Sequence, residues 1–239
     1  MKYIYVIYAF LIFAGLFLAL FPLFLLMSLF GSWGRKANWY LIKLWSELWF
    51  PLVGIFNKNI FTAHPDSKEN YIVVANHGSY LDTPLIFKAL SFFVRPIGTY
   101  EYSKIPLFGF LYRNITVVID RENNKSKVEG INGLRKTLKE GSSVFIFPEG
   151  KFNTGNEALL PFFDGAFRLS VQTGAPVLPL VFLDNTKRWS NKNFWSLKPG
   201  KNRVVFLPVF HPLDYENDAK LLKNAVRAAM QQAMEAKVD

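Results

Sequence analysis

The chain has 239 residues, a formal net charge of +10 and no cysteine. Its length suits one large domain, or a domain with an appendage. The lack of cysteine excludes disulfides, thiolate catalysis and cysteine-ligated metal sites. Because 51% of the residues are hydrophobic and 17% aromatic, the positive charge belongs to an unusually apolar protein. An anionic lipid bilayer as partner explains both properties. Nucleic acid would explain only the charge, no nucleic-acid motif occurs, and we expect no such partner.

The first element along the chain is an uncharged segment from Tyr3 to Phe30. As a helix, at about 1.5 Å per residue, it is long enough to cross a hydrocarbon core of roughly 30 Å. A cleaved signal peptide is the alternative, but one lysine precedes the segment and no Ala-x-Ala site follows it. Arg35, Lys36 and Lys43 follow the segment, whereas only Lys2 precedes it. The positive-inside rule therefore predicts that the domain after this segment lies at the cytoplasmic face of the inner cell membrane.

A second apolar stretch runs from Trp39 to Phe56 and mixes aromatic residues with charged ones. Trp45, Trp49 and Phe50 beside Lys43 and Glu47 are typical of a helix that lies in the membrane interface. The two stretches suit either a hairpin buried in one leaflet or one span followed by an interfacial helix, and the sequence leaves both open. We predict a membrane anchor over residues 1–56 and a second domain over residues 57–239.

Beyond residue 57, short apolar runs alternate with stretches of helical periodicity. This alternation predicts an α/β domain with a mixed central sheet flanked by helices. The predicted strands are 72–75, 92–97, 116–119, 143–147, 177–183 and 203–210, and the predicted helices are 82–90, 125–140, 165–173 and 218–237.

The first candidate site follows the strand over residues 72–75, where the chain reads Asn76-His77-Gly78-Ser79-Tyr80-Leu81-Asp82. Asp82 would lie in the first turn of the next helix, close to His77. A neutral imidazole can take a proton from a hydroxyl near pH 7 when a carboxylate holds its other ring nitrogen. A loop histidine bonded to a helix-capping aspartate is the structural alternative, and this pair alone leaves both readings open. No Gly-x-Ser-x-Gly elbow occurs, so the activated hydroxyl is expected to belong to the substrate.

Three further motifs follow in order, and a fourth segment lies between the first two. The three motifs are Ile115–Arg121, Val144–Asn153, which contains Phe147-Pro148-Glu149-Gly150, and Gly174–Val181. The segment between the His77 motif and Ile115–Arg121 is Lys104-Ile105-Pro106-Leu107-Phe108-Gly109. Together with His77 and Asp82, this ordered set resembles the glycerolipid acyltransferase family, particularly the bacterial 1-acylglycerol-3-phosphate acyltransferases. The resemblance covers residues 71–210.

The resemblance implies transfer of a fatty acyl chain from an acyl carrier protein or coenzyme A thioester to the free sn-2 hydroxyl of a lysophospholipid. It makes His77 the general base and Asp82 its orienting acid, without an acyl-enzyme. Backbone amides near Gly78 or Gly150 would bind the oxyanion. The substrate-binding residues that it implies are Asn76, Ser79, Lys104, Arg121, Glu149, Gly150 and Lys151. It implies no metal and no cofactor, because the thioester donor is already activated.

The chain departs from the family pattern at two places. Lys151 and Phe152 follow Glu-Gly where the family commonly has Thr-Arg, and Tyr100-Glu101-Tyr102 replaces a lysine-rich segment. Both changes remove cations that are expected near the acceptor phosphate. Lys151 would have to supply the positive charge in their place. The sequence therefore leaves open a lyso lipid with an amino-acid head group as acceptor. It also leaves open a thioesterase that uses water, and a non-catalytic lipid-binding protein.

Overall fold

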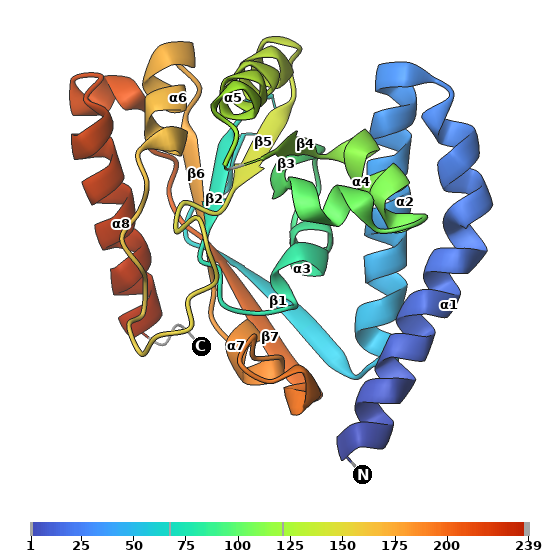
Figure 1. Cartoon of the computed structure of the whole chain (residues 1–239). Helices are drawn as coiled ribbons and strands as arrows, with labels where there is room; N and C mark the ends of the chain where they lie inside the picture. Colours follow the sequence, from blue (N-terminus) through green and yellow to red (C-terminus); the bar gives the residue numbers. More distant parts are fainter. Residues whose placement is uncertain (1, 67, 121, 237–239) are drawn as a thin grey trace.

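The computed structural model describes residues 2–66, 68–120 and 122–236, and its centre is a mixed seven-stranded sheet (Figure 1). The strand order is β1-β7-β6-β2-β5-β3-β4, and all neighbours are parallel except β6 and β7. The strands are β1 (Ile55–Phe61), β2 (Ile72–Ala75), β3 (Val94–Thr99), β4 (Val117–Ile119), β5 (Ser143–Ile146), β6 (Val177–Phe182) and β7 (Gly200–Phe206). The predicted α/β class and each predicted strand are confirmed; β2 has the predicted bounds, and the bounds of the other predicted strands are shifted.

Helices cover both faces of the sheet (Figure 1). One face carries α5 (Asn124–Lys139), α6 (Gly165–Thr173) and α8 (Ala219–Glu235), and the other carries α1 (Lys2–Ser28), α2 (Gly31–Leu52), α3 (Asp82–Ala89) and α4 (Phe108–Ile115). The short α7 (Asn185–Arg188) follows β6. Three 3₁₀ turns complete the described elements: η1 (Tyr100–Lys104), η2 (Phe194–Ser196) and η3 (Pro212–Tyr215).

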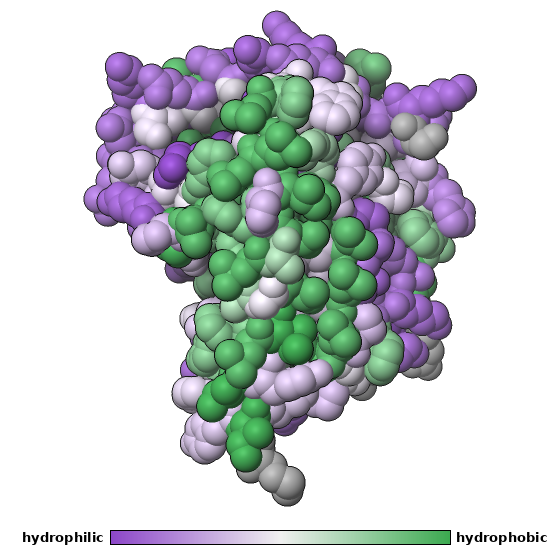
Figure 2. All heavy atoms as spheres, turned by 90° about the vertical axis from the view of Figure 1, so that its right-hand side faces the viewer, coloured by the Kyte–Doolittle hydropathy of each residue, from purple (hydrophilic) through white to green (hydrophobic). Residues whose placement is uncertain are grey.

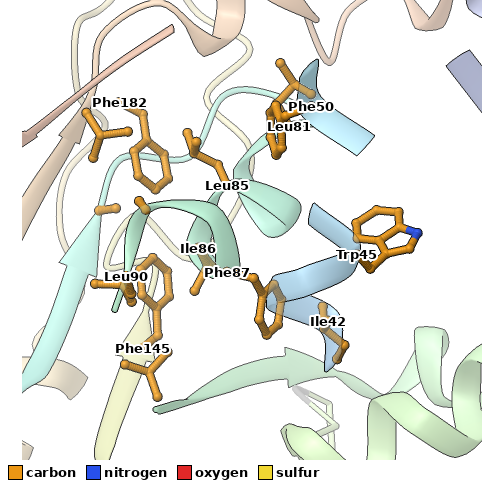
Figure 3. Close-up of a cluster of buried hydrophobic side chains, with 14 of the residues drawn as sticks. Ile42, Trp45, Phe50, Leu81, Leu85, Ile86, Phe87, Leu90, Phe145 and Phe182 are labelled. Carbon is orange, nitrogen blue, oxygen red and sulfur yellow. The ribbon is translucent and has the colours of Figure 1, made fainter. Parts of the chain in front are cut away.

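The sheet divides the buried apolar side chains into two clusters, and β2 contributes to both. Val73 and Ala75 pack on the side of α1–α4, whereas Ile72 and Val74 pack on the side of α5, α6 and α8. This alternation follows from the two-residue period of a strand, and it explains why a central strand is apolar throughout. On the first side, Leu85, Ile86 and Phe87 of α3 fill the space between α2 and the sheet (Figure 3).

The helices α1 and α2 form an antiparallel pair, and α2 lies between α1 and the rest of the protein (Figure 1). Trp45 and Trp49 stack at 5.7 Å, and their indole N–H groups donate to the backbone oxygens of Phe13 and Ala9. The prediction of an interfacial helix was based on Trp45, Trp49 and Phe50, but these side chains do not face outward. All three are buried, because α1 and α3 together cover that face of α2.

Among the described residues, α1 is the one helix long and apolar enough to span a membrane, and its side chains are largely exposed. Figure 2 shows that these side chains join exposed apolar residues of α2 in one continuous hydrophobic face. Residues with exposed large side chains on this face include Ile4, Leu11, Leu18, Leu25, Trp33, Tyr40, Leu44 and Leu48.

The strand β1 was not predicted, because its polar centre Asn57-Lys58-Asn59 breaks the apolar pattern. It pairs with β7 along its whole length, and Asn202 of β7 donates to Asn57. Because β1 begins at Ile55, the predicted boundary at residue 56 falls inside a strand of the sheet. The division into an anchor and a catalytic domain stays a prediction.

Candidate active site

The candidate site lies at one edge of the sheet, beyond the carboxyl ends of three adjacent parallel strands. His77 follows β2, Glu149 follows β5, and Asn185 follows β6. Parallel strands bring their carboxyl ends to the same edge, so residues far apart in sequence meet there.

His77 and Asp82 form the central contact of the site. Nδ1 of His77 lies 2.8 Å from Oδ2 of Asp82, and the aspartate side chain is fully buried while that of histidine is 16% exposed. The same oxygen, Oδ2, accepts hydrogen bonds from the backbone amides of Gly78 and Ser79 at 2.8 and 2.9 Å. This pairing fixes Nδ1–H on the aspartate side and leaves Nε2 as the ring nitrogen that can accept a proton.

Asn185 holds the second carboxylate oxygen and was missed by the sequence reading. Its side-chain amide donates to Oδ1 of Asp82, and its backbone oxygen accepts from the Ser79 hydroxyl. The residue is completely buried at the start of α7, a position fixed by the ion pair between Asp184 and Arg203 of β7. An asparagine two residues after a predicted strand, on the edge that also carries His77, was the available signal.

Two phenylalanine rings enclose the imidazole of His77. The ring of Phe147 stacks on it at 3.9 Å with an interplanar angle of 8°, and the ring of Phe152 lies 4.0 Å away at 31°. Phe152 also contacts Tyr80, which in turn contacts Trp189 and Phe194. Phe152, which stands in place of the family's arginine, therefore restricts the histidine ring to one plane.

Glu149 connects the histidine loop to the segment after β5. Oε1 accepts from the backbone amide of His77 at 2.7 Å, and Oε2 accepts from that of Leu160 at 2.8 Å. Burial raises the pKa of the Glu149 carboxyl, and the two amide hydrogen bonds oppose that rise. Because both carboxylate oxygens bind backbone, we assign Glu149 to positioning of the His77 loop instead of substrate binding.

The amides of Gly78 and Gly150 are both engaged within the protein. Gly78 donates to Asp82, and Gly150 donates to the backbone oxygen of Phe147. The structure therefore does not offer these two amides to an oxyanion. Gly150 has a φ of +69°, and a Cβ at this position would lie 2.6 Å from the ring of Phe163. This backbone conformation explains why the residue is glycine.

Asn76 and Ser79 also bond to backbone groups. Asn76 exchanges two hydrogen bonds with the backbone of Phe182 in β6, and the Ser79 hydroxyl donates to the backbone oxygens of Asn185 and Trp189. Both side chains are buried. These contacts join the histidine loop to β6 and α7, so we assign both residues to the scaffold of the site.

Two of the three predicted cationic residues, Lys104 and Lys151, lie within the described residues. Nζ of Lys104 lies 4.6 Å from the centre of the Tyr100 ring, and Lys151 is exposed. The prediction for Arg121 lies outside the described residues. Within the described residues, no group of three His, Asp or Glu side chains is placed to hold a metal ion.

A cavity of about 310 Å³ lies directly beside the histidine. Its wall is mainly polar and comes from the histidine loop, the segment after Glu149, the segment after β6 and the end of α8. The residues that line it include Asn76, His77, Gly78, Glu149, Asn153, Gly155, Glu157, Thr186, Ser190, Asn191, Lys192 and Met234. A second, apolar cavity of about 110 Å³ lies between α1, α2 and the residues Trp189, Phe194 and Leu197.

Comparison with known proteins identifies the family. The family model described as Acyltransferase matches residues 53–183, which is more than half of the chain and includes His77, Asp82 and Glu149. The chain belongs to the acyltransferase family. The match confirms the family resemblance seen in the ordered motifs.

Several acyltransferases resemble this chain along most of its length. A chloroplastic 1-acyl-sn-glycerol-3-phosphate acyltransferase from Brassica napus is 28% identical over 86% of this chain and 58% of its own length. A chloroplastic enzyme of the same name from Arabidopsis thaliana is 28% identical over 87% and 57%. The chain thus spans less than two thirds of these plant relatives. A 1-acyl-sn-glycerol-3-phosphate acyltransferase from Haemophilus influenzae is 28% identical over 78% of this chain and 75% of its own length.

A solved acyltransferase structure has the same fold. The crystal structure of the 1-acyl-sn-glycerophosphate (LPA) acyltransferase PlsC from Thermotoga maritima superposes with a TM-score of 0.79. It covers 99% of this chain and 97% of its own chain at 22% sequence identity. This likeness includes the N-terminal helices and supports the overall architecture of the acyltransferase described above.

Proposed function

We propose that this acyltransferase moves a fatty acyl chain to the free sn-2 hydroxyl of 1-acylglycerol-3-phosphate and so produces phosphatidic acid for phospholipid synthesis. The donor is an acyl carrier protein or coenzyme A thioester. The observation that carries the proposal is the 2.8 Å contact between His77 and the buried Asp82. The stacked ring of Phe147 holds the orientation of the imidazole. The names of the plant and bacterial relatives support the choice of acceptor.

In the proposed reaction, Nε2 of His77 takes the proton of the acceptor hydroxyl as its oxygen attacks the thioester carbonyl carbon. Asp82 keeps Nδ1 protonated and stabilises the imidazolium that forms. The carbon–sulfur bond then breaks, and the departing thiolate takes the proton from the imidazolium. The acyl chain moves in one transfer, and the histidine ends in its starting protonation state.

The surroundings of His77 suit substrates that are partly polar and partly apolar. The polar cavity of about 310 Å³ lies beside the histidine, whereas the aromatic contacts from Phe152 through Tyr80 lead to Trp189 and Phe194, which border the apolar cavity against α1. We propose that head groups bind on the polar side and acyl chains on the aromatic side.

The continuous apolar face of α1 and α2 supports attachment to a membrane. An exposed hydrophobic surface of this extent would otherwise be costly in water (Figure 2). We propose that this face contacts the bilayer and that the catalytic domain lies at the cytoplasmic surface of the inner membrane.

A second acceptor is favoured by the aromatic residues that replace the family's cations. Phe152 packs on His77, and Tyr100 lies under Lys104, so neither position supplies a charge for phosphate. A lyso lipid with an amino-acid head group would need less positive charge than 1-acylglycerol-3-phosphate. The chemistry at His77 would be the same for both acceptors.

The test is acyl transfer by the purified protein in detergent, with long-chain acyl-CoA and acyl carrier protein thioesters as donors. The two lyso lipids are offered in parallel, and free fatty acid is measured to detect transfer to water. We expect phosphatidic acid as the main product. His77→Ala should lower kcat on the order of 100-fold or more, because general base catalysis contributes about that factor.

His211→Ala is the matched control, because His211 is exposed and lies in a loop after β7. It should retain wild-type turnover. Equal turnover by wild type and His77→Ala would overturn the proposed mechanism. No turnover by the wild type with any donor and acceptor would favour a non-catalytic lipid-binding role. Acylation of the amino-acid-headed lipid alone would retain the mechanism and change the acceptor, and release of free fatty acid alone would make the protein a thioesterase.

A further inference from the structure

We propose that Lys192, in the segment after α7, binds the phosphate of the acceptor in the cavity beside His77. This inference rests on the proposed function, and it names the residue that replaces the cations missing from the family motifs. Its basis is the composition of the cavity wall and the way in which that wall is joined to the histidine.

The cavity is next to the reacting group and has the size of a head-group site. His77 and Gly78 form part of its wall, and its volume of about 310 Å³ lies at the lower end of the roughly 300–1,000 Å³ seen for ligand pockets. A glycerol phosphate head group therefore suits it better than a whole lipid. The sn-2 hydroxyl belongs to this head group, so a phosphate held in the cavity brings the hydroxyl to the histidine.

Lys192 is the one lysine or arginine among the described residues that line this cavity. The two motif lysines within the described residues, Lys104 and Lys151, do not line it. Nζ of Lys104 instead lies over the Tyr100 ring. The wall also carries the carboxylates of Glu149 and Glu157, and both oxygens of Glu149 are bound to backbone amides. Lys192 is therefore the residue of the wall that would supply positive charge to a phosphate.

The ammonium group of Lys192 has hydrogen-bonding capacity to spare. Nζ lies 3.5 Å from the backbone oxygen of Gly155, which is a long hydrogen bond for one of its three donors. Asn191 and Thr186 beside it on the wall add neutral donors for phosphate oxygens. An ammonium–phosphate contact is charge-assisted and therefore stronger than a hydrogen bond between neutral groups.

A chain of hydrogen bonds couples the position of Lys192 to that of the histidine. The Asn191 side chain lies 3.4 Å from the backbone oxygen of Asn153, and the Asn153 amide donates to the backbone oxygen of His77 at 2.6 Å. The Asn153 side chain also bonds to Gly155 and Glu157 within the same segment. The two segments that carry the proposed phosphate site are thus attached to the catalytic loop.

The test compares Lys192→Gln with Lys192→Arg, Lys151→Gln and Lys201→Gln in the purified full-length protein. Lys201 is the control, because it is an exposed lysine of β7 outside the cavity wall. Lys192→Gln should raise the KM for 1-acylglycerol-3-phosphate about tenfold or more, the factor for one lost charge-assisted hydrogen bond. The KM for the acyl donor and kcat should stay within twofold, and Lys192→Arg should restore most of the acceptor affinity.

Glycerol 3-phosphate serves as a soluble probe of the same site. It should compete with the lipid acceptor in the wild type and in Lys201→Gln, and its inhibition constant should rise about tenfold in Lys192→Gln. Glycerol, which lacks the phosphate, should inhibit none of these three proteins at the same concentrations. Loss of inhibition in Lys192→Gln alone would support a phosphate contact at Lys192.

The kinetic results distinguish a wrong assignment of Lys192 from a wrong proposed function. If the wild type acylates 1-acylglycerol-3-phosphate and Lys192→Gln has an unchanged acceptor KM, the assignment of Lys192 is wrong while the proposed function stands. A raised acceptor KM in Lys151→Gln alone would move the site to Lys151. Equal rises in donor and acceptor KM in Lys192→Gln would make the lysine a structural part of the wall. A wild type that does not acylate any phosphate-headed acceptor overturns the proposed function and the inference together.

Discussion

The side-chain amide of Asn185 donates a hydrogen bond to Oδ1 of Asp82, across 103 positions of sequence. Oδ2 of the same carboxylate meets His77 Nδ1 and two backbone amides, so its orientation is fixed from both sides. His77, Asp82 and Asn185 thereby form one hydrogen-bonded chain that links the ends of β2 and β6. The orientation of the His77 ring thus depends on Asn185, which contacts neither substrate in the proposed mechanism.

Asn185→Ala should lower kcat on the order of tenfold, because Asp82 loses a hydrogen bond to a charged group that is worth about 1.5–3 kcal/mol. The KM values for donor and acceptor should stay within twofold, since the residue positions Asp82 and does not contact a lipid. Steady-state kinetics on the purified protein measure both quantities. Asn132→Ala, at an exposed position of α5, should behave as wild type.

Asn185→Asp sharpens the same test. It nearly preserves the side-chain volume but places a second carboxylate against Asp82, so it should lower kcat more than Asn185→Ala does. Full activity in Asn185→Asp would show that the contact does not orient Asp82.

Glu149→Gln should change how stability varies with pH. Burial raises the pKa of Glu149 above its ordinary value of 4.5, so the folded protein binds this proton more tightly than the unfolded chain. Stability of the wild type should therefore fall as pH rises from about 4.5 through the raised pKa, because a buried carboxyl must ionise. Glutamine does not titrate, so the Tm difference between wild type and Glu149→Gln should shrink over that pH range. A constant Tm difference between the two proteins from pH 4 to pH 8 would contradict a raised pKa of Glu149.

The same substitution should also lower activity. Glutamine offers one oxygen, whereas the backbone amides of His77 and Leu160 each need an acceptor. One buried amide is left without a partner, at a cost of about 1–3 kcal/mol. A loss of kcat with unchanged KM values would place this cost in the histidine loop. A raised acceptor KM alone would instead favour the substrate-binding role that the family resemblance implies.

Trp49→Ala should destabilise the pairing of α1 with α2. The side chain is 1% exposed, stacks on Trp45, and donates its indole N–H to Ala9 of α1 at 2.9 Å. Removal of such a buried ring typically costs about 3–5 kcal/mol. Thermal unfolding in detergent should show a lower Tm, whereas Trp33→Ala, at a position 64% exposed, should have little effect. Equal Tm shifts for the two variants would refute the packing described for Trp49.

Leu11→Glu combined with Leu18→Glu should weaken attachment to lipid vesicles. Both leucines are more than half exposed on the apolar face of α1, so the substitutions place two charges where we propose contact with hydrocarbon. Flotation with vesicles that contain anionic lipid should show less bound protein. Val128→Glu on α5 introduces one such charge at a similarly exposed position of the opposite side and should bind as wild type. Undiminished binding of the double variant would place the membrane contact elsewhere.

Local patterns in the sequence determined the fold class and the centre of the site. The short run 72–75 is apolar throughout and rich in β-branched residues, and this pattern predicts the central strand that the structure shows. The five-residue step from His77 to Asp82 spans one loop and the start of one helix, so the two side chains meet through local geometry. Ordered motifs over residues 71–210 were sufficient to identify the family, and the family model confirmed it.

Contacts between distant segments were decided only by the tertiary structure. β1 is stabilised by pairing with β7, Trp45 and Trp49 are buried because α1 covers them, and Asn185 reaches Asp82 because β2 and β6 are neighbours in the sheet. Glu149, Asn76 and Ser79 likewise bind backbone groups that no local pattern could place nearby. Hydrophobic periodicity reports whether a residue is buried, but not which segment buries it, since the partner is set by the order of strands and the packing of helices. That is why the sequence identified a base and its acid, whereas the structure identified the residues that hold them.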